Sequence, residues 1–369
     1  TQVKSVAIHV NSVADRITLG GSIDSANAVE ITVTDDSLAT KIHLGSDVDV
    51  TAAGAANITI GNIADANAHN LGAHAGTGNV TVGTIANGAD VDIDGADIIL
   101  GNTTAASVDI DGTDITIAAI TATDGISAVA SNDGAITSNG VLASSGSSIE
   151  LIAAGAIDVG GDVTNSSGEV VISGNTDGAI DADDEDVTIS ANLDAGGDVV
   201  VTVLGAAGDI NVRADQANRG STTLNGPVSL NENLVAAADI TVNGDIDLGG
   251  AAPRLINAGG SLDINGDITD DGGAIALTLT GTEEVVVANI GVGSPVGALE
   301  ITTDQAGLGG DIEAASVDTK NAGMTTLHAS VDIDVSGAAG ITLGHIDGAE
   351  SLTLTSTNAA GDVTLRNAD

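Results

Sequence analysis

Apolar and polar residues alternate along almost the whole of this chain. The stretch Val29–Thr34 reads VEITVT, Asn79–Gly83 reads NVTVG and Asp239–Leu248 reads DITVNGDIDL. Apolar residues at every second position, with Thr, Asp, Asn or Ser between them, are typical of β-strands with one buried face. Gly, Asn and Asp separate the segments, and no stretch shows the 3.6-residue period of a helix. The pattern therefore predicts an all-β protein of many short strands.

The strand segments recur at intervals near 20 residues. NITIGNIADA at Asn57 returns as NVTVGTIANG at Asn79, and VDIDGADIIL at Val91 returns as VDIDGTDITI at Val108, which are offsets of 22 and 17. A unit this short cannot bury its own apolar face, so stacking must supply the core. We expect a single-stranded parallel β-helix, or β-solenoid, of roughly 17 coils with about 17–25 residues each. It should run continuously over residues 1–369 without a clear internal boundary.

The composition supports this fold over the competing all-β arrangement, a stack of β-sandwiches. The 369 residues include no Phe, Trp, Tyr or Cys and only one Met, although 42% are hydrophobic. A sandwich normally has aromatic residues in its core. A narrow coil interior, in which like residues stack on like, is filled evenly by Val, Ile, Leu and Ala.

The charge of the chain excludes several classes of partner. The net charge is −44 with eight Lys and Arg, and no basic residue occurs between Ile42 and Val212. Nucleic acids and anionic membrane surfaces both require cationic side chains, so neither is expected as a partner. No apolar run approaches the roughly 18 residues of a membrane-spanning helix, so membrane insertion is not expected either. The carboxylates must be solvated or neutralised by dissolved cations.

Two longer stretches resemble a known family. GAITSNGVLASSGSSIELIAAGAIDVGGDVTNSSGEVVIS, from Gly134 to Ser173, and GGSLDINGDITDDGGAIALTLTG, from Gly259 to Gly281, are similar to the filamentous-haemagglutinin type of parallel β-helix in exported bacterial surface proteins. The resemblance extends over nearly the whole chain. It implies a right-handed β-helix, export, surface display, and adhesion or fibre formation.

The segment Asp90–Gly95 has the D-x-D-x-D-G spacing that opens a calcium-binding loop. An EF-hand loop also needs an apolar residue at position 8 and an acid at position 12, but these positions hold Asp97 and Gly101. A different calcium site follows from stacking of the two VDIDG copies, which brings like charges together. We therefore consider calcium between coils, against a solvated acidic face, at Asp92 over Asp109, Asp94 over Asp111 and Asp97 over Asp114. No other cofactor is expected.

Catalytic and transition-metal sites find less support in the sequence. Some parallel β-helices act on polysaccharides through paired carboxylates, for which Asp183 and Asp186 are candidates. Sugar sites normally use aromatic platforms, which this chain lacks, so we do not expect an enzyme. His69 and His74 share the stretch NAHNLGAHAG, which we interpret as a plain loop rather than a transition-metal site.

These observations favour a structural protein at the cell surface or outside the cell. Strand patterns run from Val6–Val10 to Asp362–Leu365 without an evident capping element, and uncapped solenoid ends can stack head to tail into a filament or surface layer. The expected partner is therefore the protein itself. The first alternative is the passenger or a fragment of a larger adhesin, with a surface glycan or host receptor as partner. A polysaccharide-active enzyme is the minor alternative.

Overall fold

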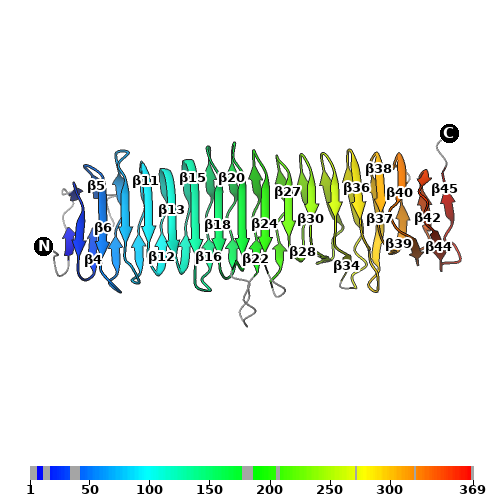
Figure 1. Cartoon of the computed structure of the whole chain (residues 1–369), viewed down its shortest axis with the longest axis horizontal. Helices are drawn as coiled ribbons and strands as arrows, with labels where there is room; N and C mark the ends of the chain where they lie inside the picture. Colours follow the sequence, from blue (N-terminus) through cyan, green and yellow to red (C-terminus); the bar gives the residue numbers. More distant parts are fainter. Residues whose placement is uncertain are drawn as a thin grey trace. The chain divides into compact units, whose positions relative to one another are not determined.

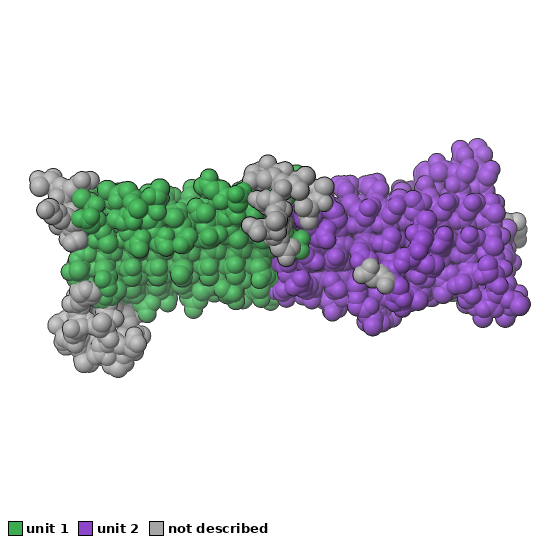
Figure 2. Space-filling model, turned by 90° about the horizontal axis from the view of Figure 1, so that it is seen from below, with its two compact units in different colours: residues 1–187, 204–207 green, residues 188–203, 208–369 purple. Residues whose placement is uncertain are grey.

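The computed structural model describes residues 6–10, 17–33, 42–176, 186–204, 208–270, 272–319 and 321–366. The chain forms two compact units, residues 1–187 with 204–207 and residues 188–203 with 208–369, shown in different colours in Figure 2. All regular structure in the described residues is β-strand. None of the described segments is a helix that could cross a membrane.

Unit 1 is a coil of stacked parallel strands (Figure 1), and their pairing arranges them in three rows. The first row consists of β1 (Val6–Val10), β4 (Val29–Val33), β7 (Ile58–Ile60), β10 (Val80–Val82), β12 (Asp97–Leu100), β14 (Asp114–Ile117), β16 (Ile136–Ser138) and β19 (Ile157–Val159). The second row consists of β2 (Ile17–Leu19), β5 (Ile42–Leu44), β8 (Ile63–Asp65), the first parts of β13 (Thr103–Gly112) and β15 (Ile120–Ala130), β17 (Leu142–Ser144) and β20 (Val163–Asn165). The third row consists of β3 (Ile23–Ser25), β6 (Val48–Ala52), β9 (Leu71–His74), β11 (Asp90–Asp94), the last parts of β13 and β15, β18 (Ile149–Ala153) and β21 (Val170–Gly174).

Unit 2, which the chain enters within β22 (Val187–Ile189), has the same three-row arrangement. Its first row consists of β25 (Ile210–Val212), β28 (Val228–Leu230), β31 (Ile246–Leu248), β34 (Ile268–Asp270), the first part of β39 (Ile312–Asp318), β41 (Val331–Val335) and β44 (Leu352–Ser356). Its second row consists of β23 (Leu193–Ala195), β26 (Gln216–Asn218), β29 (Leu234–Ala236), β32 (Arg254–Ala258), β35 (Leu277–Gly281), β37 (Val296–Thr302), the last part of β39, β42 (Ile341–Leu343) and β45 (Val363–Leu365). Its third row consists of β24 (Val199–Val203), β27 (Thr222–Asn225), β30 (Ile240–Val242), β33 (Leu262–Ile264), β36 (Glu284–Val287), β38 (Gln305–Leu308), β40 (Met324–Leu327) and β43 (Ile346–Asp347).

The prediction of a parallel β-solenoid is confirmed. The described strands form about 16 turns, close to the roughly 17 expected. The registers agree with the sequence offsets, since Ile58 pairs with Val80 and Val91 pairs with Val108. The handedness of the coils and their continuity over residues 1–369 stay predictions.

The interior of each coil contains ladders of aliphatic side chains. In β11 and β12 the side chains of Val91, Ile93, Ile98 and Leu100 point inward and are at most 1% exposed, as their alternation with acids predicts. Ile93 stacks on Ile110, which is 0% exposed. Each such side chain stabilises the fold by about 1.5–3 kcal/mol through its burial.

A second kind of ladder lies at the corners of the coils. Asp or Asn residues at the starts of strands accept, through Oδ1, a backbone N–H from the next coil, 18 to 25 residues later in the chain. We call these acceptors the corner Asx positions: Asp47, Asn57, Asn62, Asn70, Asn79, Asp114, Asn192, Asp198, Asp215, Asn233, Asp239, Asp245, Asn289 and Asp311. Most of these bonds are exposed, and in each the Asx side chain provides the acceptor for a backbone N–H at the corner.

The corner ladder can be tested at Asp239, whose Oδ1 lies 2.8 Å from the Ser261 nitrogen. Asp239→Ala should lower the free energy of unfolding by about 0.5–1.5 kcal/mol because the Ser261 N–H loses its acceptor. Asp239→Asn retains an amide oxygen there and should stay within about 0.5 kcal/mol of the parent. Chemical denaturation monitored by circular dichroism measures both changes.

The matched control for this test is Asp263→Ala. Asp263 lies on β33, and its carboxylate makes no hydrogen bond among the described residues, so its loss should change stability little. If Asp239→Asn and Asp239→Ala are equally destabilised, the Asx side chain does not act as an acceptor and the interpretation is wrong.

Candidate functional site

Four of the six predicted metal ligands gather on the outer face of the third row in unit 1. Asp92 of β11 pairs in register with Asp109 of β13, and Asp94 pairs with Asp111. All four side chains point away from the core, since they alternate with buried Val and Ile residues. We call these four residues the aspartate patch. In register, neighbouring parallel strands place the carboxylates roughly 4.8 Å apart.

The other two predicted ligands lie elsewhere. Asp97 and Asp114 pair with each other, as expected, but on β12 and β14 of the first row. Asp97 Oδ2 accepts a hydrogen bond of 2.8 Å from the Asn79 amide, and Asp114 Oδ1 accepts the Ala135 N–H at 3.1 Å. Asp114 is therefore a corner Asx position and Asp97 is bonded to one, Asn79, so the six predicted residues divide into two separate groups.

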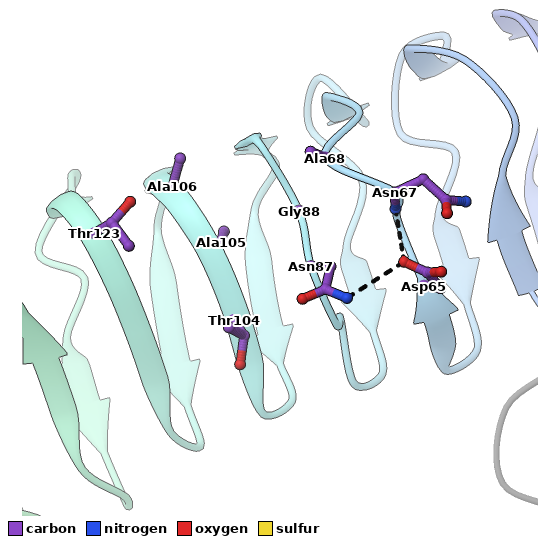
Figure 3. A pocket seen from close by; sticks show the side chains of 9 residues that line it. All are labelled: Asp65, Asn67, Ala68, Asn87, Gly88, Thr104, Ala105, Ala106 and Thr123. Atoms are coloured by element: carbon purple, nitrogen blue, oxygen red, sulfur yellow. Dashed lines mark hydrogen bonds between the residues drawn. The ribbon is translucent and has the colours of Figure 1, made fainter.

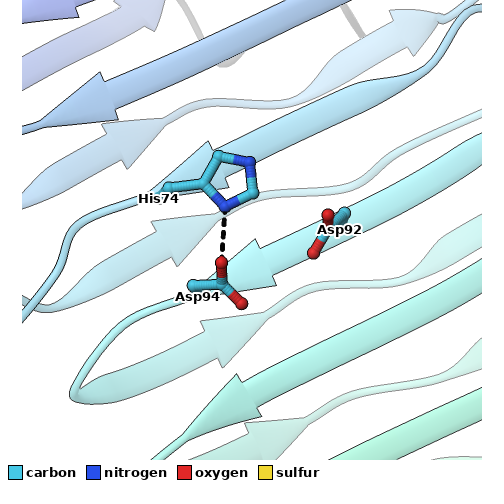
Figure 4. A group of neighbouring side chains, drawn as sticks. All are labelled: His74, Asp92 and Asp94. Carbon is cyan, nitrogen blue, oxygen red and sulfur yellow. Dashed lines mark hydrogen bonds and ion pairs between the residues drawn. The ribbon is translucent and has the colours of Figure 1, made fainter.

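A histidine completes the patch. The sequence predicts a plain loop around His74, and this prediction is wrong: His74 is the last residue of β9 and pairs with Asp94 of β11. Its Nδ1 lies 2.7 Å from Asp94 Oδ2, a contact drawn as a dashed line in Figure 4, and its Nε2 lies 3.4 Å from Asp49 Oδ1 of β6. Aligning LGAH at Leu71 with VDID at Val91 would have placed His74 in this column.

Gly72 gives the imidazole its position. In the column next to His74 the order is Asp49, Gly72, Asp92 and Asp109. A Cβ added at Gly72 would lie 2.7 Å from His74 Nε2 and 3.1 Å from Asp49 Oδ1, so a larger residue would displace the ring. A hollow of about 380 Å³ lies at this point of the surface and is lined among others by Asp49, Gly72, His74 and Asp92.

The carboxylates of the patch repel one another. The pKa of Asp92 is raised, first by partial burial and then by the Asp94 carboxylate; His74 lowers it, while Asp109 and Asp49 raise it further. The pKa of Asp111 is raised by partial burial and by the carboxylates of Asp109, Asp94 and Asp92. No Lys or Arg occurs among the described residues of unit 1, so none of these charges has a basic partner beyond His74 there.

Within the described residues, His74, Asp92 and Asp94 are the one group whose donor atoms all lie within 4.8 Å of one another. His69, the other histidine of the stretch, lies 3.6 Å from Asp47 Oδ1 and is outside this group. An imidazole nitrogen and several carboxylate oxygens are suitable ligands for a divalent cation. Calcium between the coils, at Asp92, Asp94, Asp109 and Asp111, stays a prediction.

A larger hollow of about 480 Å³ lies at a corner of unit 1 and offers little chemistry (Figure 3). Its one carboxylate, Asp65, already accepts hydrogen bonds from the Asn67 N–H and the Asn87 amide. The remaining lining consists of Gly, Ala and Thr residues, which suit a polar ligand but provide no acid–base pair. Of the candidate catalytic pair, Asp183 lies outside the described residues.

The repulsion within the patch predicts a pH-dependent effect of Asp111→Asn, measured in chelator. Because the fold raises the pKa of Asp111, its ionised form costs stability above that pKa, and the cost is lost as pH falls to the ordinary aspartate range. At pH 7 the variant should therefore be more stable than the parent, by at most about 0.5 kcal/mol because water screens the repulsion at this exposed side chain. The gain should shrink towards zero near pH 4, about the ordinary pKa of aspartate.

Urea unfolding at each pH measures the difference between the two proteins. Asp158→Asn is the control, because Asp158 lies on β19 of the first row beside Thr137, away from the patch. A variant that is less stable than the parent at pH 7 would contradict the repulsion.

Searches for related proteins found no match for this chain among family models, curated proteins or solved structures. The resemblance to the filamentous-haemagglutinin type of β-helix therefore stays a prediction. The assignment of a parallel β-solenoid depends on the strand pairing described above, and the candidate site depends on its own geometry.

Proposed function

We propose that this protein is a non-enzymatic structural subunit that assembles head to tail into a filament or layer outside the cell. The supporting observation is a change in exposure at the last described turn of unit 2. Val363 and Leu365 of β45 are 46% and 55% exposed, whereas Ile341 and Leu343, their register partners in β42, are 1% and 0% exposed. Side chains at equivalent positions are thus buried in one turn and exposed in the next.

The adjacent strand shows the same change. Leu352 and Leu354 of β44 are partly exposed, while their partners Val331 and Ile333 are fully buried. Among the described strands β44 pairs only with β41, so its other edge has no partner strand there. A free parallel edge with apolar side chains is a template for another strand.

A second edge of this kind occurs in unit 1. Of the described strands, β1 pairs only with β4, and its Val6 and Ile8 are partly exposed although their partners in β4 are buried. The two edges differ from each other, so pairing between copies is heterologous and continues without closing, which produces a filament. The acidic lateral surface disfavours side-by-side contacts between copies, since the net charge is −44.

An extracellular location agrees with the composition. Eight Lys and Arg and no aromatic residues leave few cleavage points for common proteases. Short strands paired on both sides in coil after coil expose little unpaired backbone along the lateral faces. Both properties suit a fibre exposed to its surroundings.

The proposal predicts concentration-dependent polymerisation of the purified protein. Sedimentation velocity should show species that lengthen with concentration, and negative-stain electron microscopy should show thin, unbranched filaments. The double substitution Val363→Asp with Leu365→Asp should reduce the polymer fraction at least tenfold, because it places two charges in the proposed contact.

The matched control is Val141→Asp with Val292→Asp. These side chains are 47% and 44% exposed but lie outside both edges, so the control adds the same charge at similar exposure. A parent protein that stays monomeric at high concentration overturns the proposal. Polymerisation that both double variants retain equally would also overturn it.

A further inference from the structure

We propose that His74, Asp49 and Asp92 bind a borderline transition-metal dication such as Zn²⁺ over Gly72, with Asp94 as the positioning residue. The three ligands come from β9, β6 and β11, which are consecutive strands of the third row of unit 1. A bound ion would therefore join three successive coils. The inference does not depend on the assembly proposed above.

The orientation of the imidazole is the first argument. His74 Nδ1 lies 2.7 Å from Asp94 Oδ2, which is the distance of a strong N–H···O hydrogen bond. With the proton on Nδ1, a neutral ring presents the lone pair of Nε2 on its other side. Metal-binding histidines usually donate their second ring N–H to a carboxylate in this way, which fixes the tautomer and the ring.

The surroundings of Nε2 are the second argument. Asp49 Oδ1 lies 3.4 Å from Nε2, so the lone pair faces an anionic oxygen. A metal ion between the two atoms, or a proton on Nε2, removes the repulsion. Two ligands that each lie about 2.1 Å from a tetrahedral ion are roughly 3.4 Å apart, so the observed separation also fits such an ion.

The space for the ion is the third argument. The hollow over Gly72 has a volume of about 380 Å³ and is lined by Asp49, His74 and Asp92. A Cβ at Gly72 would lie within 3.1 Å of both His74 Nε2 and Asp49 Oδ1, so glycine keeps this space open. Asp92 borders it on the side opposite Asp49, and donor atoms of Asp92, His74 and Asp94 lie within 4.8 Å of one another. Asp49 is outside this group, so its carboxylate has to close on the ion from the other side of Gly72.

The ligand atoms, one imidazole nitrogen and carboxylate oxygens, favour a transition-metal ion over calcium or magnesium. Calcium and magnesium prefer oxygen ligands only, and calcium takes six to eight of them. One imidazole nitrogen with carboxylates suits Zn²⁺ and its neighbours in the first transition row. Water completes the coordination, because the hollow is open to solvent on the outer face of the sheet.

The test uses the full chain, stripped with chelator and titrated with Zn²⁺, Ca²⁺ or Mg²⁺ at pH 7.5 in 150 mM KCl. Calorimetry should show one Zn²⁺ site per chain, and Zn²⁺ should raise the thermal midpoint more than an equal concentration of Ca²⁺ or Mg²⁺. Electron paramagnetic resonance of the Cu²⁺-loaded protein should show coupling to a ring nitrogen, which a solvated acidic surface would not give.

Variants assign the site to these residues. His74→Gln and Asp92→Asn should each weaken Zn²⁺ binding at least tenfold, and His74→Gln should remove the nitrogen coupling. Asp94→Asn should weaken binding about 10- to 100-fold, the usual effect of losing such an orienting carboxylate. His69→Gln is the matched control, since His69 also lies near one aspartate but outside the group, and it should bind as the parent does.

Two results would overturn the inference. One is a parent protein whose thermal midpoint responds equally to Ca²⁺ and Zn²⁺, which would favour calcium at the aspartate patch. The other is unchanged Zn²⁺ affinity in His74→Gln, which would show nonspecific binding to the acidic surface. Thermal unfolding of each variant in chelator separates loss of the site from loss of the fold.

Discussion

The fold depends on one constraint, which is that the backbone of each coil is satisfied only by its neighbouring coils. Strands of three to five residues, such as Val80–Val82, have no partner within their own turn and pair on both sides with strands one turn away. Register between coils must therefore be kept over the whole of each unit. Aliphatic ladders enforce it inside, because a slip of one residue would turn a buried Ile outward.

The corner Asx positions extend the same constraint to the turns. There the backbone changes direction, and an Asp or Asn oxygen accepts the N–H that the strand ladder does not satisfy. Asp and Asn are among the best residues for turns in any case, because their side chains bond to nearby backbone groups. Here the bonded N–H lies one coil away. The Asp or Asn side chain, which usually bonds within its own turn, therefore links two neighbouring coils.

Much of the fold could be predicted because the sequence is periodic, both within strands and from one coil to the next. Two-residue alternation identified the inward residues Val91 and Ile93, and the 17-residue offset correctly paired Asp92 with Asp109. The pattern of VDIDGADIIL predicts a strand, a turn and a second strand, and β11 and β12 confirm it. Pairing the segment with its copy does not by itself show that the turn places Asp97 and Asp114 in another row than the other four acids.

The role of His74 could not be read from the VDIDG repeats for a related reason. It replaces an aspartate in the column of Asp94, and its own strand reads LGAH rather than VDID, so no obvious repeat contains it. Its ring position depends on Gly72, whose missing side chain matters only when Asp49 and Asp92 are known to flank it. The candidate site therefore depends on His74 and Gly72, the two residues that depart from the repeat.

Because Asp and Asn both occur at the corner Asx positions, the net charge of this protein can change without a change in its fold. Either residue offers the same oxygen to the same N–H, as Asn289 and Asp311 do in successive coils. A corner can therefore gain or lose a negative charge by a single substitution while its hydrogen bond is kept. Selection can thus adjust the surface potential to the salt of the surroundings one corner at a time, leaving the register untouched.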